Sequence, residues 1–145
     1  MDLEKAKRVL EDGGYTCVLC KGQAIRTSTH RGVKPLMELL EEDVAGFSAA
    51  DKVVGKATAL LYCLLGVKAV YAAVISEPAL EVLLRHGIAA TWGQTVPYIV
   101  NRAGTGRCPM ELATEDIDDP AAAPAAIENA LKKLQKGNGS LQSSG

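Results

Sequence analysis

The spacing of apolar residues predicts a helix followed by a β-hairpin at the start of the chain. Apolar positions over residues 3–10 repeat at helical spacing, and Asp12-Gly13-Gly14 ends the pattern. Residues 15–20 and 23–27 are extended, β-prone stretches separated by Lys21-Gly22, which is typical of a tight turn between antiparallel strands. The first of these strands is nearly continuous in apolar residues, so we expect both its faces to be covered.

Two helical segments are predicted next. Residues 32–43 carry apolar side chains at helical spacing and end in an acidic run. Ser48-Ala-Ala-Asp51 has the spacing of a capping box directly before an apolar run, so we expect a helix to begin there, continue to Leu65 and end at Gly66. Apolar residues occupy more than half of its circumference, which indicates a core helix packed against a sheet.

The remaining pattern alternates strands and helices. Residues 68–75 are typical of a central strand, and Pro78 and Gly87 bracket a helix. Residues 88–92 and 95–100 are predicted as two short strands, separated by a glycine.

A closing helix is expected over residues 124–134. The chain of 145 residues has the size of one domain, which we place at residues 1–136, followed by a flexible tail over residues 137–145. The element order favours an α/β fold, a three-layer α/β/α sandwich with a mixed sheet.

Charge and hydropathy restrict the partners and the location. Sixteen Lys and Arg oppose seventeen Asp and Glu, a formal net charge of -1, so nucleic acid is not an expected partner. The longest apolar stretches, residues 57–67 and 67–75, are too short to span a bilayer, and no membrane contact is expected. Charged residues over 2–8 argue against a secretory signal, so we expect a cytoplasmic protein.

The pair Cys17 and Cys20 has the C-x-x-C spacing of metal-binding and redox sites. It lies in a predicted strand, where residues three apart point to opposite faces. We therefore expect two buried structural cysteines rather than one chelating pair.

Two short motifs carry a resemblance to a known family. Asp51-Lys-Val-Val-Gly-Lys56-Ala and Arg107-Cys108-Pro-Met-Glu111, together with the hairpin and the strand at Val70, resemble the DUF1893 family over residues 1–135. The resemblance implies a cytidine-deaminase-like fold.

Members of that fold that bind zinc carry a His or Cys followed two residues later by Glu, and a Pro-Cys-x-x-Cys motif. This chain has neither: the first motif contains Asp51, Gly55 and Lys56, and Glu111 stands three residues after Cys108. Two ligands do not make a catalytic zinc site, so we expect no metal and no cofactor. His30 and His86 lie far from both motifs and are expected to be ordinary surface or capping residues.

Four residues of these motifs are candidates for catalysis. Cys108 precedes Pro109 at a predicted helix start, where a thiol can act as a nucleophile, and the Lys56 ammonium could assist it. Asp51 and Glu111 are candidates for proton transfer or for binding a substrate amine. The alternatives are structural: capping for Asp51, snorkelling to water for Lys56, inert packing for Cys108 and helix-start stabilisation for Glu111.

The loop before Cys108 is a candidate ligand-binding segment. Its glycines and arginines could present backbone N–H groups and guanidinium groups to an anion, and a plain surface loop is the alternative. The candidate residues are Arg102, Gly104, Thr105, Gly106 and Arg107.

Two classes of function remain open at this point. The first is a metal-independent enzyme or binding domain for a small nucleotide-like or anionic ligand, with cysteine-dependent chemistry. The second is a non-catalytic ligand-binding or regulatory module, and a zinc deaminase with atypical ligands is a further alternative. We also expect a homo-oligomer formed through an apolar patch, or else an intramolecular core, made of Trp92, Val96, Pro97 and Tyr98.

Overall fold

The chain folds around a single five-stranded sheet. The computed structural model describes residues 2–30, 32–100 and 104–144, with side chains up to residue 134. The elements in chain order are α1 (Asp2–Gly13), β1 (Cys17–Lys21), β2 (Ala24–Ser28), α2 (Lys34–Leu39), β3 (Ser48–Val54), α3 (Lys56–Leu65), β4 (Ala69–Ser76), α4 (Glu77–Arg85), β5 (Ala89–Val96), α5 (Pro109–Ala113), a 3-10 turn (Pro120–Ala122) and α6 (Ala123–Ser144).

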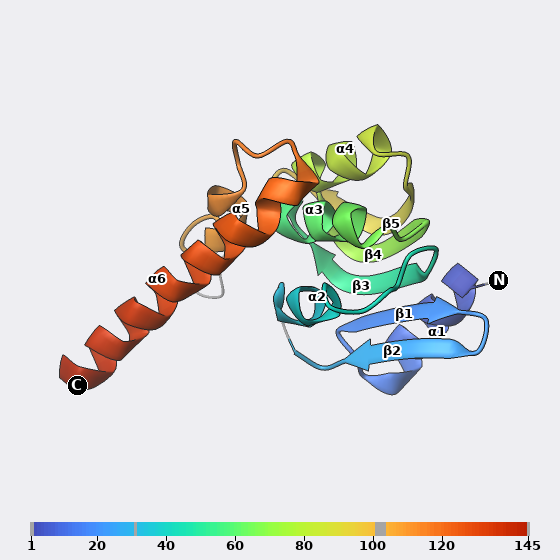
Figure 1. Cartoon of the computed structure of the whole chain (residues 1–145), viewed down its shortest axis with the longest axis horizontal. Coiled ribbons are helices and arrows are strands. Elements are labelled where there is room, and N and C mark those ends of the chain that lie inside the picture. The colour runs from blue at the N-terminus through green and yellow to red at the C-terminus, as the bar shows by residue number, and fades with distance from the viewer. Residues whose placement is uncertain (1, 31, 101–103, 145) are drawn as a thin grey trace.

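The sheet is mixed, in the order β2-β1-β3-β4-β5 (Figure 1). β1 is antiparallel to both β2 and β3, and β3, β4 and β5 run parallel to one another. The hairpin is confirmed, and so is the α/β class with a mixed sheet. Helices connect the parallel strands, as a parallel crossover requires.

Helices lie on both faces of the sheet (Figure 1). α1 packs on β1 and β3, where Ala6 and Leu10 meet Val18, Cys20 and Ala50 in a small buried cluster. The larger cluster fills the other face, beneath α2, α3 and α4. Burial on both sides explains why β1 is apolar at nearly every position, as the sequence predicts.

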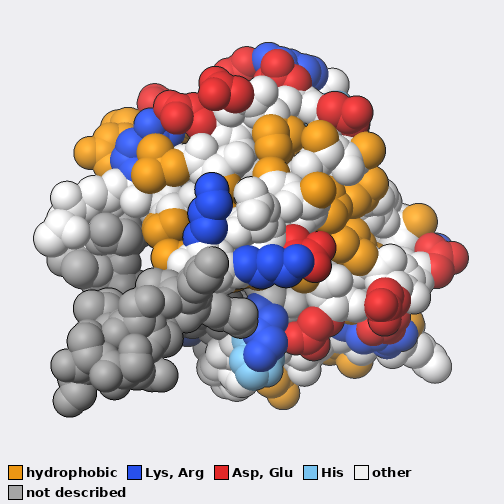
Figure 2. All heavy atoms as spheres, turned by 60° about the vertical axis from the view of Figure 1, so that its left-hand side comes forward, with side chains coloured by type: hydrophobic (Ala, Val, Ile, Leu, Met, Phe, Trp, Pro, Cys, Tyr) orange, Lys and Arg blue, Asp and Glu red, His pale blue; other side chains and the backbone are white. Residues whose placement is uncertain are grey.

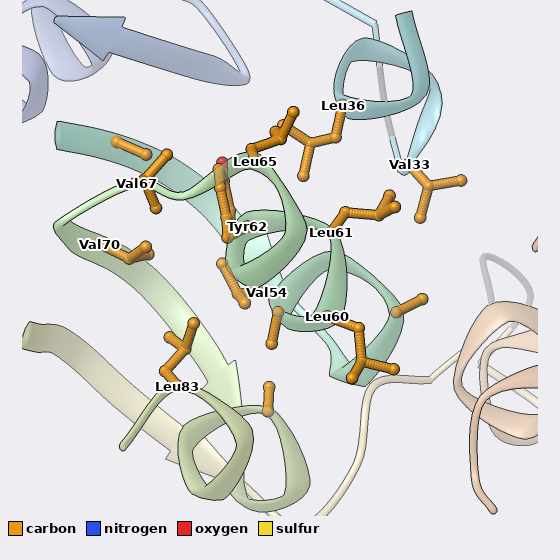
Figure 3. Packing of buried hydrophobic residues seen from close by; sticks show 14 of the residues in the cluster. Val33, Leu36, Val54, Leu60, Leu61, Tyr62, Leu65, Val67, Val70 and Leu83 are labelled. Carbon is orange, nitrogen blue, oxygen red and sulfur yellow. The ribbon is translucent and has the colours of Figure 1, made fainter. Parts of the chain in front are cut away.

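α3 is the core helix (Figure 3). Leu60, Leu61 and Tyr62 are fully buried, and the helix packs against α2, α4 and the sheet. It ends at Gly66, as predicted, because this residue adopts the left-handed conformation with φ of 76° and its N–H bonds back to the carbonyls of Tyr62 and Cys63.

The C-x-x-C pair is split between the two faces. Cys17 belongs to the larger cluster and Cys20 to the smaller one, and both are buried. The prediction of two buried cysteines on opposite faces of the strand is confirmed, because the side chains alternate along β1.

The predicted helix start at Ser48–Asp51 is wrong. These residues belong to β3, in which Asp51 lies opposite Cys17 of β1 and opposite Ala72 of β4. The capping-box spacing was a coincidence, because pairing with two strands distant in sequence satisfies this backbone as a central strand. The helix begins at Lys56, after Gly55.

The two predicted strands at residues 88–92 and 95–100 are one strand, β5, which ends at Val96. Gly93 does not interrupt it. A Cβ at this position would lie 2.9 Å from the carbonyl oxygen of Ala73, so glycine allows the backbones to approach closely.

Two helices differ in length from the prediction. α2 covers only Lys34–Leu39 of the expected 32–43, because the chain turns at Leu40. α6 continues to Ser144 instead of ending near Leu134, and its first turns pack on α3 and α5. The flexibility of residues 137–145 stays a prediction.

The surface in Figure 2 carries charges of both signs. On this face some Lys and Arg side chains form a row near the centre, and others lie among acidic and hydrophobic side chains. In the part of the chain that the structure describes, no helix combines the length and the apolar character needed to cross a membrane.

Candidate functional site

The candidate residues lie near the carboxyl ends of β3 and β4, where α3 and α4 begin. This edge is where open α/β sheets bind ligands. The loop after β5 returns to it: Cys108 N donates to Ile99 O at 2.7 Å, and Val100 pairs with Arg107 in an antiparallel bridge. α5 starts directly afterwards at Pro109, as predicted.

Glu111 is buried at the junction of these segments and is 2 % exposed. Its Oε1 accepts hydrogen bonds from Lys56 N at 2.7 Å and from Ser76 Oγ at 2.9 Å, and its Oε2 accepts one from Ile99 N at 3.1 Å. Glu111 therefore ties together the starts of α3 and α4 and the segment after β5.

Gly55 makes room for this carboxyl group. It is the N-cap residue of α3 and has no side chain to cap the helix, so Glu111 supplies the cap from α5. A Cβ on Gly55 would lie 2.9 Å from Glu111 Oε1. Glycine is needed here for space, since its φ of -96° suits any residue.

Asp51 is the second buried carboxyl group and is 8 % exposed. Its Oδ2 accepts a hydrogen bond from the Tyr62 hydroxyl at 2.7 Å, and its Oδ1 accepts one from Val53 N at 3.3 Å. Burial raises the pKa of Asp51 to about 7, and the hydrogen bonds from Tyr62 and the backbone oppose that rise.

Cys17 completes this group from β1. Its Sγ lies 3.3 Å from the Tyr62 hydroxyl oxygen. Burial, with a smaller contribution from the nearby Asp51 charge, raises the pKa of the Cys17 thiol well above its usual value, so the thiol stays protonated at neutral pH.

A cavity of about 380 Å³ opens beside Asp51. Its polar and thiol-bearing lining comes from Thr16, Cys17, His30, Asp51, Lys52, Thr58 and Cys108. Its apolar lining comes from Val33, Val53, Ile99 and Met110, and Gly32 completes the wall.

A second cavity of about 470 Å³ lies between the hairpin and α2. Cys17 and His30 line both cavities, so the two adjoin. The Arg26 guanidinium, which lines the second cavity, pairs with Glu42 at 2.9 Å.

The structure brings Asp51 and Cys108 to one cavity and places the other two catalytic candidates elsewhere. The Glu111 carboxyl group is engaged in three hydrogen bonds with Lys56 N, Ser76 Oγ and Ile99 N. Lys56 Nζ donates to Glu115 O at 2.8 Å and lies 3.9 Å from Asp118, so it points toward the end of α5. Neither residue lines the cavity beside Asp51.

The described residues of the candidate ligand loop, 104–107, do not line the cavity. Arg102 falls outside the described residues, and Gly104, Thr105 and Gly106 are exposed. Arg107 pairs with Glu115 at 2.9 Å and lies over the Tyr98 ring.

Sequence reasoning missed three contributors to the site. His30 lines both cavities, while His86 is the C-cap of α4, as expected of a capping residue. Tyr62 was not singled out, and Cys17 was expected only as a buried structural cysteine. A lone tyrosine in an apolar helix was the available signal, because a buried hydroxyl needs a hydrogen-bond partner.

The residues at the two motifs do not fit the zinc site of the deaminase fold. The position facing α3 is occupied by the hydrogen-bonded Glu111 carboxyl group, and Gly55 offers no ligand. Among the residues that the structure describes, no group of three or more His, Cys, Asp or Glu is placed to hold a metal ion.

Comparisons with known proteins identify the family. A family model described as a domain of unknown function, DUF1893, matches residues 5–131. The fold is similar to the crystal structure of a DUF1893 family protein, TM1506, from Thermotoga maritima, with 28% sequence identity, a TM-score of 0.82 and coverage of 88% of each chain. No curated protein matches the chain. Since the family model spans most of its length, this protein belongs to the DUF1893 family.

Proposed function

We propose that this domain binds a small amine-bearing molecule in the cavity beside Asp51. The observation that carries the proposal is a buried carboxyl group at the wall of a cavity of about 380 Å³ with apolar neighbours. Small-molecule sites are usually about 300 to 1,000 Å³ and combine an apolar lining with a few fixed polar groups. The amine donates to Asp51, while Val53 and Ile99 contact the apolar part of the ligand.

An aminated heterocycle, the base-like part of a nucleotide-like ligand, fits this combination. A carboxylate accepts about four hydrogen bonds, and Tyr62 and Val53 use only part of that capacity. Anion binding by residues 102–107 stays a prediction, because residues 104–107 do not line the cavity and Arg107 already pairs with Glu115.

The test is a binding screen of small amines and aminated heterocycles by NMR on the labelled protein. We expect resonances of cavity residues such as Val53 and Met110 to shift, and the affinity to fall at least tenfold in Asp51→Asn. Asp118→Asn is the control, because its side chain is 80% exposed and lies outside the cavity. Equal affinity in both variants would refute the proposal.

A second candidate is an enzyme that uses Cys108 as a nucleophile. The half-buried Cys108 lines the same cavity as Asp51, next to Pro109 at the start of α5. Cys108→Ala separates the candidates once a ligand is known: an enzyme loses turnover and keeps binding, whereas a binding module shows no turnover in either form. Cys63→Ala, a half-buried cysteine outside the cavity, is the matched control.

We further propose that the fold is a cytidine-deaminase-like three-layer sandwich. Support comes from the antiparallel hairpin joined to three parallel strands, from the helices on both faces, and from the closeness of the starts of α3 and α5 through Glu111. Superposition on a zinc deaminase tests this: α3 and α5 should overlie the two motif-bearing helices, and a different helix order would refute it.

We also propose self-association through the β5 edge. β5 is the last strand of the sheet and carries no charged residue. Trp92 on this strand is 43% exposed, and Tyr98, which follows it, is 44% exposed. Charged residues usually protect such an edge from pairing. Light scattering at micromolar concentration should give a dimer mass that falls to the monomer in Thr91→Lys, and a monomeric parent protein would refute the idea.

A further inference from the structure

Three polar side chains form a hydrogen-bonded chain behind the cavity. Asp51 and Cys17 line the cavity wall, and Tyr62, which is fully buried and does not line it, joins them from α3. The Tyr62 hydroxyl oxygen lies 2.7 Å from Asp51 Oδ2 and 3.3 Å from Cys17 Sγ. These hydrogen bonds lead from Asp51 on the cavity wall, through Tyr62 in the core, to Cys17 on the same wall.

The direction of the hydrogen bonds depends on the charge of Asp51. When Asp51 is ionised, it can only accept, so Tyr62 donates to it and the Cys17 thiol donates to the phenol oxygen. When Asp51 is protonated, its O–H can donate to Tyr62, whose own hydrogen then turns toward the sulfur. The Asp51 and Tyr62 oxygens stay hydrogen-bonded in both states, and only the weak S–H donor of Cys17 loses its partner when Asp51 is protonated, so a proton can be gained or lost at a small cost.

We propose that Tyr62 and Cys17 act as positioning residues that hold Asp51 as a proton-exchanging group of the cavity, so that capture of a cationic amine depends on the protonation of Asp51. The inference rests on the proposed amine-binding function. On capture the ligand N–H donates to the ionised carboxylate. If the proton transfers, an N–H bond breaks and an O–H bond forms on Asp51, leaving a neutral amine.

Among the residues that the structure describes, five other groups that titrate or carry charge lie at this cavity or contact Asp51. They are Cys17 on β1, Tyr62 on α3, His30 after β2, Cys108 before α5 and Lys52 on its own strand. The high pKa of the Cys17 thiol keeps it neutral, which leaves the hydrogen bond from Tyr62 as the main stabilising contact of the charged carboxylate on this side.

The first measurement needs no ligand. The carboxyl ¹³C resonance of Asp51 is followed against pH in the wild type, in Tyr62→Phe and in Tyr71→Phe, a control on the other face of the sheet. We expect a wild-type midpoint near neutrality, an upward shift of about one pH unit in Tyr62→Phe because the charged form loses its donor, and no shift in the control. If the Asp51 midpoint in Tyr62→Phe equals that of the wild type, the proposed positioning role of Tyr62 and Cys17 is overturned.

Cys17→Ala serves as the second variant if Tyr62→Phe does not fold. It removes the thiol that polarises the Tyr62 hydroxyl, so the midpoint should rise above the wild-type value, by less than about one pH unit. Cys63→Ala, whose sulfur lies near Val82 O instead, should leave it unchanged. A lower or unchanged Asp51 midpoint in Cys17→Ala would also overturn the proposed positioning role.

The second measurement uses benzamidine, an apolar ring with an amidinium group that stays charged across the range. Its affinity for the wild type should rise at least tenfold from pH 5 to pH 8, and in Tyr62→Phe the rise should move to higher pH with the Asp51 midpoint. Absence of binding to the wild type at every pH would overturn the proposed function and the coupling. If benzamidine binds but its affinity does not change with pH around the Asp51 midpoint, the coupling to Asp51 protonation is overturned and the proposed binding function stands.

Discussion

Two buried carboxyl groups, 60 positions apart in sequence, serve different ends in this small domain. Glu111 accepts from two backbone N–H groups and one hydroxyl, lines neither of the two cavities described above, and joins three segments. Asp51 accepts from one hydroxyl and one backbone N–H, borders a cavity, and has a pKa raised to about 7.

The difference teaches that burial alone does not mark a functional acid. A carboxyl group whose acceptor positions point at fixed donors stabilises the fold, whereas one that borders free space keeps capacity for a ligand. The four experiments below test this contrast, beginning with the largest expected effect.

Glu111→Ala should lower the free energy of unfolding by about 3 to 5 kcal/mol. The reason is that Lys56 N, Ile99 N and the Ser76 hydroxyl lose a common acceptor. Each buried unsatisfied group costs about 1 to 3 kcal/mol, and the two backbone N–H groups fall near the low end because their hydrogen bonds are only partly buried. Urea denaturation measures the change. Glu128→Ala, in an exposed pair on α6, is the control and should change stability by less than about 0.5 kcal/mol. Similar decreases in the free energy of unfolding in Glu111→Ala and Glu128→Ala would contradict the structural role assigned to Glu111.

Asp51 should make the protein less stable as pH rises. Its pKa is raised from about 3.9 in the unfolded chain to about 7 in the folded one, so between these values the folded state binds more protons. Its contribution is therefore most favourable below pH 4 and declines by on the order of 4 kcal/mol up to pH 7. Urea titrations at several pH values should show this decline, and Asp51→Asn should flatten it. A parallel profile in the variant would mean that other groups cause the decline.

Gly55→Ala should destabilise by about 1 to 3 kcal/mol, because the new methyl group would lie 2.9 Å from Glu111 Oε1 in a packed junction. Thermal unfolding measures the effect. The same change in the Glu111→Ala background should cost less, since the closest group is gone and only Ile99 Cγ1, 3.2 Å from the new Cβ, still crowds it. Equal losses in both backgrounds would show that the two residues do not interact.

Cysteine accessibility should show the smallest effect, a difference in rate with no loss of stability. In the native protein at pH 7, a small thiol reagent should label the half-buried Cys108 and Cys63 before the buried Cys17 and Cys20. Mass spectrometry after short labelling times identifies the sites. Early labelling of Cys17 would show that the hydrogen-bonded group of Asp51, Tyr62 and Cys17 is accessible to solvent.

Local patterns in the sequence were sufficient for much of the fold. The first helix, the hairpin, the central strand at Val70 and the helix after Ser76 follow from periodicity and from turn residues that act on their neighbours. β3 was missed because its identity depends on pairing with β1 and β4, and its first four residues match a capping box. Such pairing joins residues far apart in sequence, so the spacing of neighbouring residues does not predict it.

The candidate site was recovered in part for the same reason. Asp51 and Cys108 were singled out and do line one cavity. The expected partnership of Lys56 with Cys108 does not form, because the core helix starts at Lys56, beyond the expected start at Ser48–Asp51. His30 reaches the cavity through a loop whose path no periodicity specifies.

The crowding between Gly55 and Glu111 restricts how this sequence can change over time. Position 55 precedes α3, where Ser, Asp or Asn would cap the helix by itself, but any side chain there meets the carboxyl group that already does so. The helix can thus be capped from its own start or from α5, and not by both. Related sequences should exchange the two positions together, because either change made alone passes through a less stable protein.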